Sequence, residues 1–554
     1  MKKILLPLLS VVVGLTVTTS CIEEFDPQTS YVTIDQAGNA PGSYDNFVSS
    51  LTTSLTGKFL FGSDKPYDYG YPSFYQVRDV QGQDITLSYD GHWYQTWYTS
   101  GIGLGPQYLV CQVPWTYYYS WIKGCNTVIT MAGAEPESDK IAGAGIAYTM
   151  RAMFYMDLAR MFAPKTYGLD KNAETVPIVT ETTSASEMTS NPRATNEVMW
   201  NFILSDLDKA EQYLTNYKRE DIYTPDLSVV YGLKARAYLV MEDWANAEKY
   251  AKLAQSSYSL MSDNEYTSHD TGFNTPNSSW MFGLKYRDTD PNIKENDADS
   301  SWGSFMCLEM KFSNTNCGYA SNYGHQFLID RHLYETIPAT DFRKKCFVDF
   351  NIDEMPEEKQ IEALSTYSDF PEWLYSAGHK ENKGVGGLSL KFRLTGGEEG
   401  HYNQYIGFLV SVPIMRVEEM YLIEAEAAGM QNEANGIALL TQFAKTRDAS
   451  YVYGKHNEAY GNQATSAFQN EVWWQRRIEL WGEGFATFDI KRLNKGIIRN
   501  YANSNHLETR RWNTTTPPEW MNWCIIQTET NYNTACTNNP TPIAPAEDSD
   551  EYIW

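Results

Sequence analysis

A dense group of charged residues near the C-terminal end of the chain could carry out acid–base chemistry. Glu479 and Glu483 are four residues apart, Asp489 follows them, and Arg477 and Arg492 lie close by. Two carboxylates that face each other across a cleft can act as acid and base in glycoside hydrolysis. Residues four apart on a helix share one face, however, and carboxylates beside arginines there form ion pairs. The spacing therefore favours a structural role. We expect four earlier glutamates to lie on a solvated or repeat-packing helix face: Glu418, Glu419, Glu424 and Glu426.

The common catalytic and cofactor-binding motifs do not occur in the sequence. There is no GxSxG, HExxH, GxxxxGK[ST] or GxGxxG pattern, and the eight histidines are scattered singly. No two cysteines have the CxxC spacing of a zinc knuckle. We therefore expect no catalytic activity, no cofactor and no metal site.

Aromatic residues crowd one early segment. They make up 14% of the chain, with 39 tyrosines and 16 tryptophans. Tyrosine and tryptophan combine a flat apolar face with a polar tip, which suits the faces and edges of sugar rings. In "GHWYQTWY" we expect Trp93 and Trp97 to be stacking platforms with Tyr94 beside them, and Arg78 and Asp79 to supply hydrogen bonds nearby. For any single ring, core packing is the alternative.

The charge balance argues against nucleic acid as a partner. The chain has 44 basic and 69 acidic residues, a net charge of −25. A chain this acidic repels polyanions, and neutral or cationic ligands fit better.

The N-terminal segment has the order of a secretory signal. Lys2 and Lys3 precede the apolar run "ILLPLLSVVVGLTV", and small residues lead to Cys21. The run is shorter than the ~20 residues that cross a bilayer, and no later stretch is long or charge-free enough to do so. We expect residues 1–20 to be a signal peptide. The sequence before Cys21 resembles the lipobox of bacterial lipoproteins, in which the cysteine is acylated and anchors the chain to a membrane.

Seven cysteines remain after Cys21, so they cannot all pair with one another. Cys307 with Cys317, and Cys524 with Cys536, are spaced for loop-closing disulfides, which an exported protein could keep.

Two parts of the chain, about residues 137–257 and 412–495, show the periodicity of amphipathic helices. The segment "ARAYLVMEDWANAEKYAKLA" resembles a tetratricopeptide repeat, whose paired helices stack because neither buries its apolar face alone. Thr195 is placed to cap a helix. One apolar stripe runs along Ala147, Met150, Phe154, Leu158 and Met161.

The regions at about 62–120 and 259–410 differ in amino-acid composition from the two helical parts. They are rich in Gly, Ser, Asn, Asp and aromatic residues, which predicts long loops with short strands. Insertions this long are functional or are ordered on a scaffold. We therefore expect a mainly α fold in one domain, residues 21–554. A tetratricopeptide-like helical repeat scaffold would carry long loop-rich, ligand-binding insertions and few short strands.

Four stretches together resemble the SusD family (RagB/SusD), surface lipoproteins of Bacteroidetes. Their order and spacing span nearly the whole mature chain, and "IEEFDP" after Cys21 resembles the acidic export tag of such lipoproteins. Two departures are Gln475, where the family often has glutamate, and Ala486, where arginine is frequent. The stretches are "MRAMFYMDLARMFAP" from Met150, "EVMWNFILSDLDKAEQYL" from Glu197, "VPIMRVEEMYLIEAEA" from Val412 and "QRRIELWGEGFATFDIKRL" from Gln475.

The resemblance implies a non-catalytic lipoprotein on the outer face of the outer membrane. It would bind a glycan and deliver it to a SusC-like TonB-dependent transporter. The family holds glycan against an aromatic arc, to which the early cluster and the middle insertion would both contribute. Binding of peptides, a surface glycoside hydrolase and a purely structural assembly role are the alternatives. The middle insertion offers Trp302, Tyr319, Asn322 and Tyr323.

Overall fold

The computed structural model describes residues 40–59, 65–99, 101–270, 272–294, 300–311, 318–456, 465–543 and 549–554. The predicted signal peptide, Cys21 and Cys317 lie outside these residues. Within the described ranges, no helix has both the length and the apolar character needed to cross a membrane.

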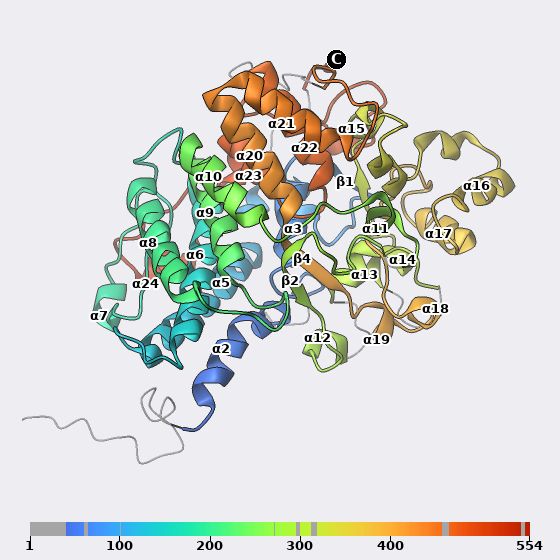
Figure 1. The fold of residues 1–554 in the computed structure, drawn as a ribbon. Helices are drawn as coiled ribbons and strands as arrows, with labels where there is room; N and C mark the ends of the chain where they lie inside the picture. The colour runs from blue at the N-terminus through green and yellow to red at the C-terminus, as the bar shows by residue number, and fades with distance from the viewer. Residues whose placement is uncertain are drawn as a thin grey trace, which may run out of the picture.

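Long helices from both predicted helical parts, together with α5 from outside them, form one continuous stack (Figure 1). Each helix contacts the next in chain order, and the contact between α10 and α20 joins the two parts. The whole middle loop-rich region lies between α10 and α20 in the sequence. The chain therefore leaves the stack after α10 and returns to it at α20. The stack comprises α5 (Leu109–Ala132), α6 (Ile141–Phe162), α8 (Asn196–Leu214), α9 (Leu227–Met241), α10 (Trp244–Gln255), α20 (Val417–Gln431), α21 (Glu433–Lys445) and α22 (Ala467–Glu479).

Local signals in the sequence explain where these helices form. The Thr195 side chain accepts a hydrogen bond from the Val198 N–H at 3.4 Å, which confirms it as the cap of α8. The stripe predicted for α6 is buried, but so is every residue from 143 to 162. Because α6 is buried on all sides, it is an interior helix and not an amphipathic surface helix.

Two small antiparallel sheets connect the loop-rich regions to each other and to the stack. β1 (Ile85–Leu87) pairs with β3 (Phe327–Ile329), and Leu87 lies opposite Phe327. β2 (Trp280–Lys285) pairs with β4 (Ser411–Arg416), which leads directly into α20. The pairing of β1 with β3 places the early loop-rich region beside the middle one.

The loop-rich regions contain more helix than the sequence predicts. Helices of one or two turns are too short to show a hydrophobic period, and their residues are held by contacts with distant parts of the chain. A satellite core that includes Leu328, Leu374 and Leu388 supports α14, α16 and α17. The early region contains α3 (Ser73–Val80), α4 (Gln95–Thr99) and the start of α5. The middle region contains α11 (Asp263–Thr267), α12 (Pro291–Lys294), α13 (Trp302–Met306), α14 (Tyr319–Asn322), α15 (Arg331–Thr336), α16 (Glu357–Leu364), α17 (Pro371–Gly378), α18 (Gly397–Gly400) and α19 (Gln404–Gly407). The remaining helices are α2 (Ser43–Thr53), α7 (Ala185–Met188), α23 (Ala486–Arg492) and α24 (Gln527–Tyr532).

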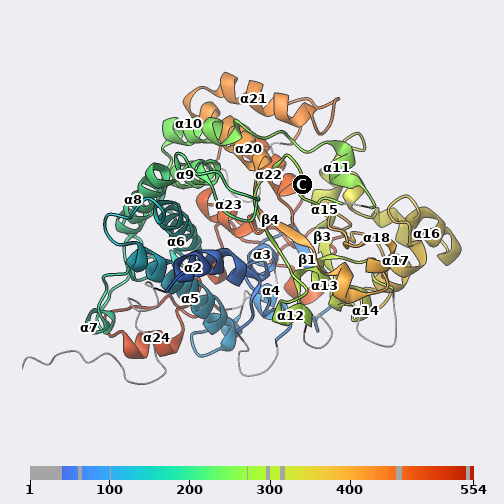
Figure 2. The ribbon, with the colours of Figure 1, turned by 60° about the horizontal axis from the view of Figure 1, so that its bottom comes forward.

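Figure 2 shows the loop-rich elements α13, α14, α16, α17 and α18 together on one side of the molecule, and α5, α7, α8 and α24 on the other.

The predicted disulfide between Cys524 and Cys536 is wrong, because both are buried free thiols. Each Sγ donates instead to a nearby backbone carbonyl, Cys524 to Pro540 at 3.5 Å and Cys536 to Thr537 at 3.6 Å. Burial raises the pKa of Cys524 to about 11 and that of Cys536 to about 12, so both stay protonated at neutral pH. Cys307 is also a buried free thiol.

Close packing of α20 on α21 gives a test of the repeat-like stack. A Cβ added at Gly436 would lie 2.3 Å from the Gly429 Cα, whereas one added at Gly124 in α5 would only touch Leu51 at 3.4 Å. Alanine favours helix over glycine by about 1 kcal/mol, but forcing atoms into a packed interface costs about 1–3 kcal/mol. We expect Gly436→Ala to lower the thermal unfolding midpoint and Gly124→Ala to leave it unchanged or raise it. Equal midpoints for the two variants would contradict the observed packing.

Candidate functional site

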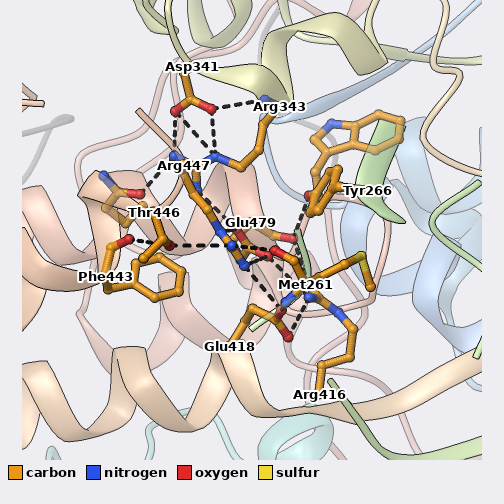
Figure 3. Close-up of polar contacts among 12 residues, drawn as sticks. Met261, Tyr266, Asp341, Arg343, Arg416, Glu418, Phe443, Thr446, Arg447 and Glu479 are labelled. Carbon is orange, nitrogen blue, oxygen red and sulfur yellow. Dashed lines mark hydrogen bonds and ion pairs between the residues drawn. The ribbon is translucent and has the colours of Figure 1, made fainter. Parts of the chain in front are cut away.

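The charged residues that could have formed a catalytic pair are instead a buried ion network. Glu479, at the end of α22, is fully buried and accepts hydrogen bonds from Arg416 at 3.1 Å, Arg447 at 3.1 Å and Arg343 at 3.2 Å (Figure 3). Glu418, also buried, forms ion pairs with Arg416 at 2.8 Å and Arg447 at 3.1 Å. Solvent and substrate have no access to these carboxylates.

The other members of the predicted charge cluster are paired in the same way. Glu483 accepts from Lys391 and Arg416, each at 2.8 Å. Asp489 accepts from Arg476 at 2.7 Å and from Arg492 at 2.8 Å. The structural interpretation of these acidic residues is therefore confirmed. Further buried pairs join Arg477 to Asp84, Arg236 to Glu419 and Arg492 to Glu426.

The network keeps Glu479 ionised. Burial alone would raise the pKa of its carboxyl, but Arg447, Arg416 and Arg343 together hold that pKa well below its usual range. A general acid needs a proton near neutral pH, so Glu479 is unsuited to that role. Among the described residues, no group of three or more His, Cys, Asp or Glu side chains is arranged to hold a metal ion.

An exposed aromatic cluster is formed by Trp93, Tyr319 and Tyr323. The exposed fractions are 41% for Trp93 and 42% for Tyr323, while Tyr319 is half-buried between them. The Trp93 and Tyr319 ring centroids are 6.3 Å apart, and those of Tyr319 and Tyr323 are 5.5 Å apart. We call these three residues the aromatic cluster. It unites two of the sequence segments singled out above, and the half-buried Asn322 lies on the same helix, α14.

The pairing of β1 with β3 explains how these residues meet. Leu87 ends β1, and its partner Phe327 begins β3. In an antiparallel pair, the segment that leaves one strand lies beside the segment that enters the other. The chain that continues to Trp93 therefore meets the chain that arrives from Tyr319.

His325 and Tyr89 support the cluster and were not predicted. The Trp93 backbone N–H donates to His325 Nδ1 at 3.2 Å, and the two rings stack at 6.2 Å. Burial lowers the pKa of His325 to about 4, so the ring is neutral at pH 7. Because Nδ1 accepts, the proton is on Nε2, which donates to the Tyr89 hydroxyl at 3.0 Å. Tyr89 lies just before "GHWYQTWY" and His325 just after Tyr323, but nothing in their spacing signals this role.

Five predicted ligand contacts are buried, and direct contact with a ligand is a wrong expectation for them. A side chain in the interior offers a ligand no surface, whatever its chemical type. They are Arg78, Asp79, Tyr94, Trp97 and Trp302.

Each of the five has a structural partner. Arg78 pairs with Asp157 at 3.1 Å, and Asp79 accepts from the backbone N–H groups of Gly484 and Ala486 at 2.9 and 3.1 Å. The Tyr94 hydroxyl lies 2.6 Å from that of Tyr69. The last two rings pack edge-on, Trp97 against Tyr67 at 5.1 Å and Trp302 against Phe392 at 4.6 Å.

The cluster can bind through ring faces and edges. Its three rings come from two loop segments on a supported base, and a half-buried amide lies beside them. Such rings suit the C–H faces of sugars, with aromatic contacts worth about 0.5–1.5 kcal/mol each beyond the area they bury.

The stacked helix pairs and the loop-rich side with its aromatic cluster define a mainly α, repeat-type binding protein. Comparison of the sequence with models of known protein families then indicates the family within this class. The family model described as "SusD family" matches residues 334–550, and the one described as "Starch-binding associating with outer membrane" matches residues 93–239. The chain is a member of the SusD-like family.

Solved structures share the fold. A SusD-like carbohydrate-binding protein from Bacteroides vulgatus is 21% identical with a TM-score of 0.67, covering 89% of this chain and 97% of its own. A laminarin-binding SusD-like protein is 16% identical with a TM-score of 0.59, covering 90% and 98%. Surface glycan-binding protein A from Bacteroides thetaiotaomicron, in complex with laminarihexaose, is 14% identical with a TM-score of 0.61, covering 90% and 99%. No curated protein matches the chain. The predicted mainly α, SusD-like fold is confirmed.

The ion network predicts a strong effect of one isosteric change. Glu479→Gln would leave the surrounding arginines without their central charge, and breaking a buried ion pair costs about 3–5 kcal/mol. The thermal unfolding midpoint should fall clearly at pH 7, whereas Glu398→Gln, an exposed carboxylate of α18, should leave it unchanged.

The same pair of proteins gives a pH test. The folded pKa of Glu479 lies below its ordinary value of 4.5, so its stabilisation is fully present above that pH and is lost as the pH falls through the depressed folded pKa. The difference in midpoint between wild type and Glu479→Gln should be constant above about pH 5 and shrink in stronger acid. A difference that grew towards low pH would contradict the assignment.

Proposed function

We propose that this protein is a cell-surface lipoprotein that captures oligosaccharide or polysaccharide and delivers it to a SusC-like TonB-dependent transporter. The observation that supports glycan capture is the exposed aromatic cluster of Trp93, Tyr319 and Tyr323. Membership of the SusD-like family and the family description "Starch-binding associating with outer membrane" support the same proposal. The lipobox-like sequence at Cys21 supports a lipid anchor, and "IEEFDP" after it, which resembles an acidic export tag, supports display on the cell surface.

The mechanism is capture and transfer, with no bond made or broken. A sugar ring stacks its C–H face on the exposed rings while its hydroxyls bond to water and to nearby polar groups such as Asn322. The hydroxyls are already solvated before binding, so the net affinity is low, on the order of micromolar to millimolar. A weak site suits hand-over, because the ligand must leave again.

Membrane attachment offsets the low affinity. A tethered binding protein beside a transporter raises the effective concentration of captured ligand at the transporter entrance. The strongly acidic character of the chain, with a net charge of −25, favours neutral glycans over polyanionic ones.

The proposal predicts which substitutions weaken binding. Trp93→Ala together with Tyr319→Ala removes two rings, so retardation of the chain from residue 22 in glycan affinity gels should weaken roughly 10- to 100-fold. Laminarin, starch and other plant, host and microbial polysaccharides form the panel. Tyr108→Ala, which removes a 40% exposed tyrosine at the start of α5, is the matched control and should bind as wild type.

Reducing-sugar release is measured in parallel. Release of sugar would refute the non-catalytic mechanism. Retardation that survives the double substitution would place binding elsewhere, and no retardation by any glycan would favour peptide ligands.

A further inference from the structure

A cavity of about 470 Å³ lies away from the aromatic cluster. One face of α5 forms its base, the segment 177–191 one wall, and α24 with Asn533 another. Figures 1 and 2 both place α7 and α24 on the side of the molecule opposite α14. The volume falls within the range of small-molecule sites, roughly 300–1,000 Å³.

Aromatic rings line this cavity from two elements. The half-buried Tyr119 belongs to α5 and rests on the buried Trp115, with the two ring centroids 4.5 Å apart. Tyr532 comes from α24 and is 55% exposed. Aromatic rings on the base and on one wall of a cavity can hold a flat, C–H-rich ligand.

Planar polar groups lie between the rings and are held in place. Glu181 faces the cavity and accepts from Arg151 at 2.5 Å, and Arg151 is itself buried and bound to Asp206 at 2.8 Å. Although burial acts to raise it, the pKa of Glu181 is lowered by Arg151, so the carboxylate stays charged. It is a preorganised acceptor for hydroxyl groups.

Hydrogen bonds connect the walls of the cavity to one another without filling it. Tyr119 donates to the Pro177 carbonyl at 2.7 Å, and Asn126 donates to that of Val179 at 3.1 Å. Asn533 donates to the Asn191 carbonyl at 2.7 Å and accepts from the Asn191 N–H at 2.9 Å. The cavity is therefore a built feature that remains open while its walls are bonded to each other.

We propose that this cavity is a second binding site for a neutral sugar unit. Rings on the base and one wall, threonine hydroxyls and a fixed carboxylate match the faces and hydroxyls of a hexose. An aliphatic chain would cover the charged Glu181 carboxylate without offering it a hydrogen bond, which is costly. An anionic ligand would meet Glu181 and Glu529 against one lysine, Lys123. The inference rests on the proposed function for its ligand class, but it assigns a different place.

Two sites on one chain would let a polysaccharide stay bound while one contact exchanges. Because the two sites lie on opposite sides of the molecule, the gain in overall affinity requires a polysaccharide long enough to reach both of them.

Hydrogen–deuterium exchange separates the two sites. Wild type and the cluster-deficient variant Trp93→Ala/Tyr319→Ala are exposed to millimolar laminarihexaose, maltohexaose or mannohexaose. We expect at least one of these probes to slow exchange in peptides 177–191 and 527–533 of both proteins. Thr127→Phe, which fills the cavity from the half-buried face of α5, should abolish this protection, and Tyr532→Ala should weaken the affinity measured at these peptides about tenfold. Tyr405→Ala, an exposed tyrosine of α19, is the control and should change nothing.

The outcomes distinguish this inference from the proposed function. Protection around Trp93 and Tyr319 without protection of the cavity peptides overturns the second site and leaves glycan capture at the cluster intact. Protection of the cavity peptides alone supports the second site and refutes the cluster. No protection of the cavity peptides by any of the three probes, or protection that survives Thr127→Phe, overturns the inference.

Discussion

Glu479 is a carboxylate removed from water, and it is stable there because three arginine side chains reach it from separate parts of the chain. Arg343 belongs to the middle loop-rich region, Arg416 ends β4, and Arg447 follows α21. An unpaired charge in such a place costs several kcal/mol, so these segments are obliged to meet at the end of α22. The network therefore fixes the loop-rich side of the molecule against the helical stack. The aromatic cluster and the cavity lie on two sides of a body that this contact holds together.

The long helices could be predicted from sequence because their signal is local and repeated. Three- and four-residue spacing located α8, α9, α10, α20 and α21, and Thr195 marked the start of α8. The helix α5 was missed because it begins in a segment crowded with aromatics and contains Pro114 within its first two turns. The short helices of the loop-rich regions were missed for another reason: one or two turns are too few to show a period, and distant contacts decide their conformation.

The candidate site was predictable by segment but not by residue. Trp93, Tyr94 and Trp97 are close in sequence and similar in type, yet only Trp93 is exposed. Tyr94 is buried because Tyr69, Phe305 and Phe327 surround it, and all three come from other segments. The sequence shows that aromatic residues are concentrated in this segment, but tertiary contacts decide which of their side chains are exposed. The cavity shows the same limit, since its α5 stripe at 115, 119, 122 and 126 becomes a binding surface only when α24 arrives from the C-terminal end.

The pairing of β1 with β3 also dictates an order of events during folding. Trp93 rests on His325, and Leu87 on Phe327, so each contact spans more of the chain than most domains contain. Contacts between such distant residues form slowly, because the entropy cost of closing a long loop comes before the stabilisation that the contacts give. The helices α5, α6 and α8 have their partners nearby in sequence, so we expect them to assemble first. An exported chain would therefore carry an unfinished aromatic surface until its middle region docks, and its need for protection from aggregation is greatest in that interval.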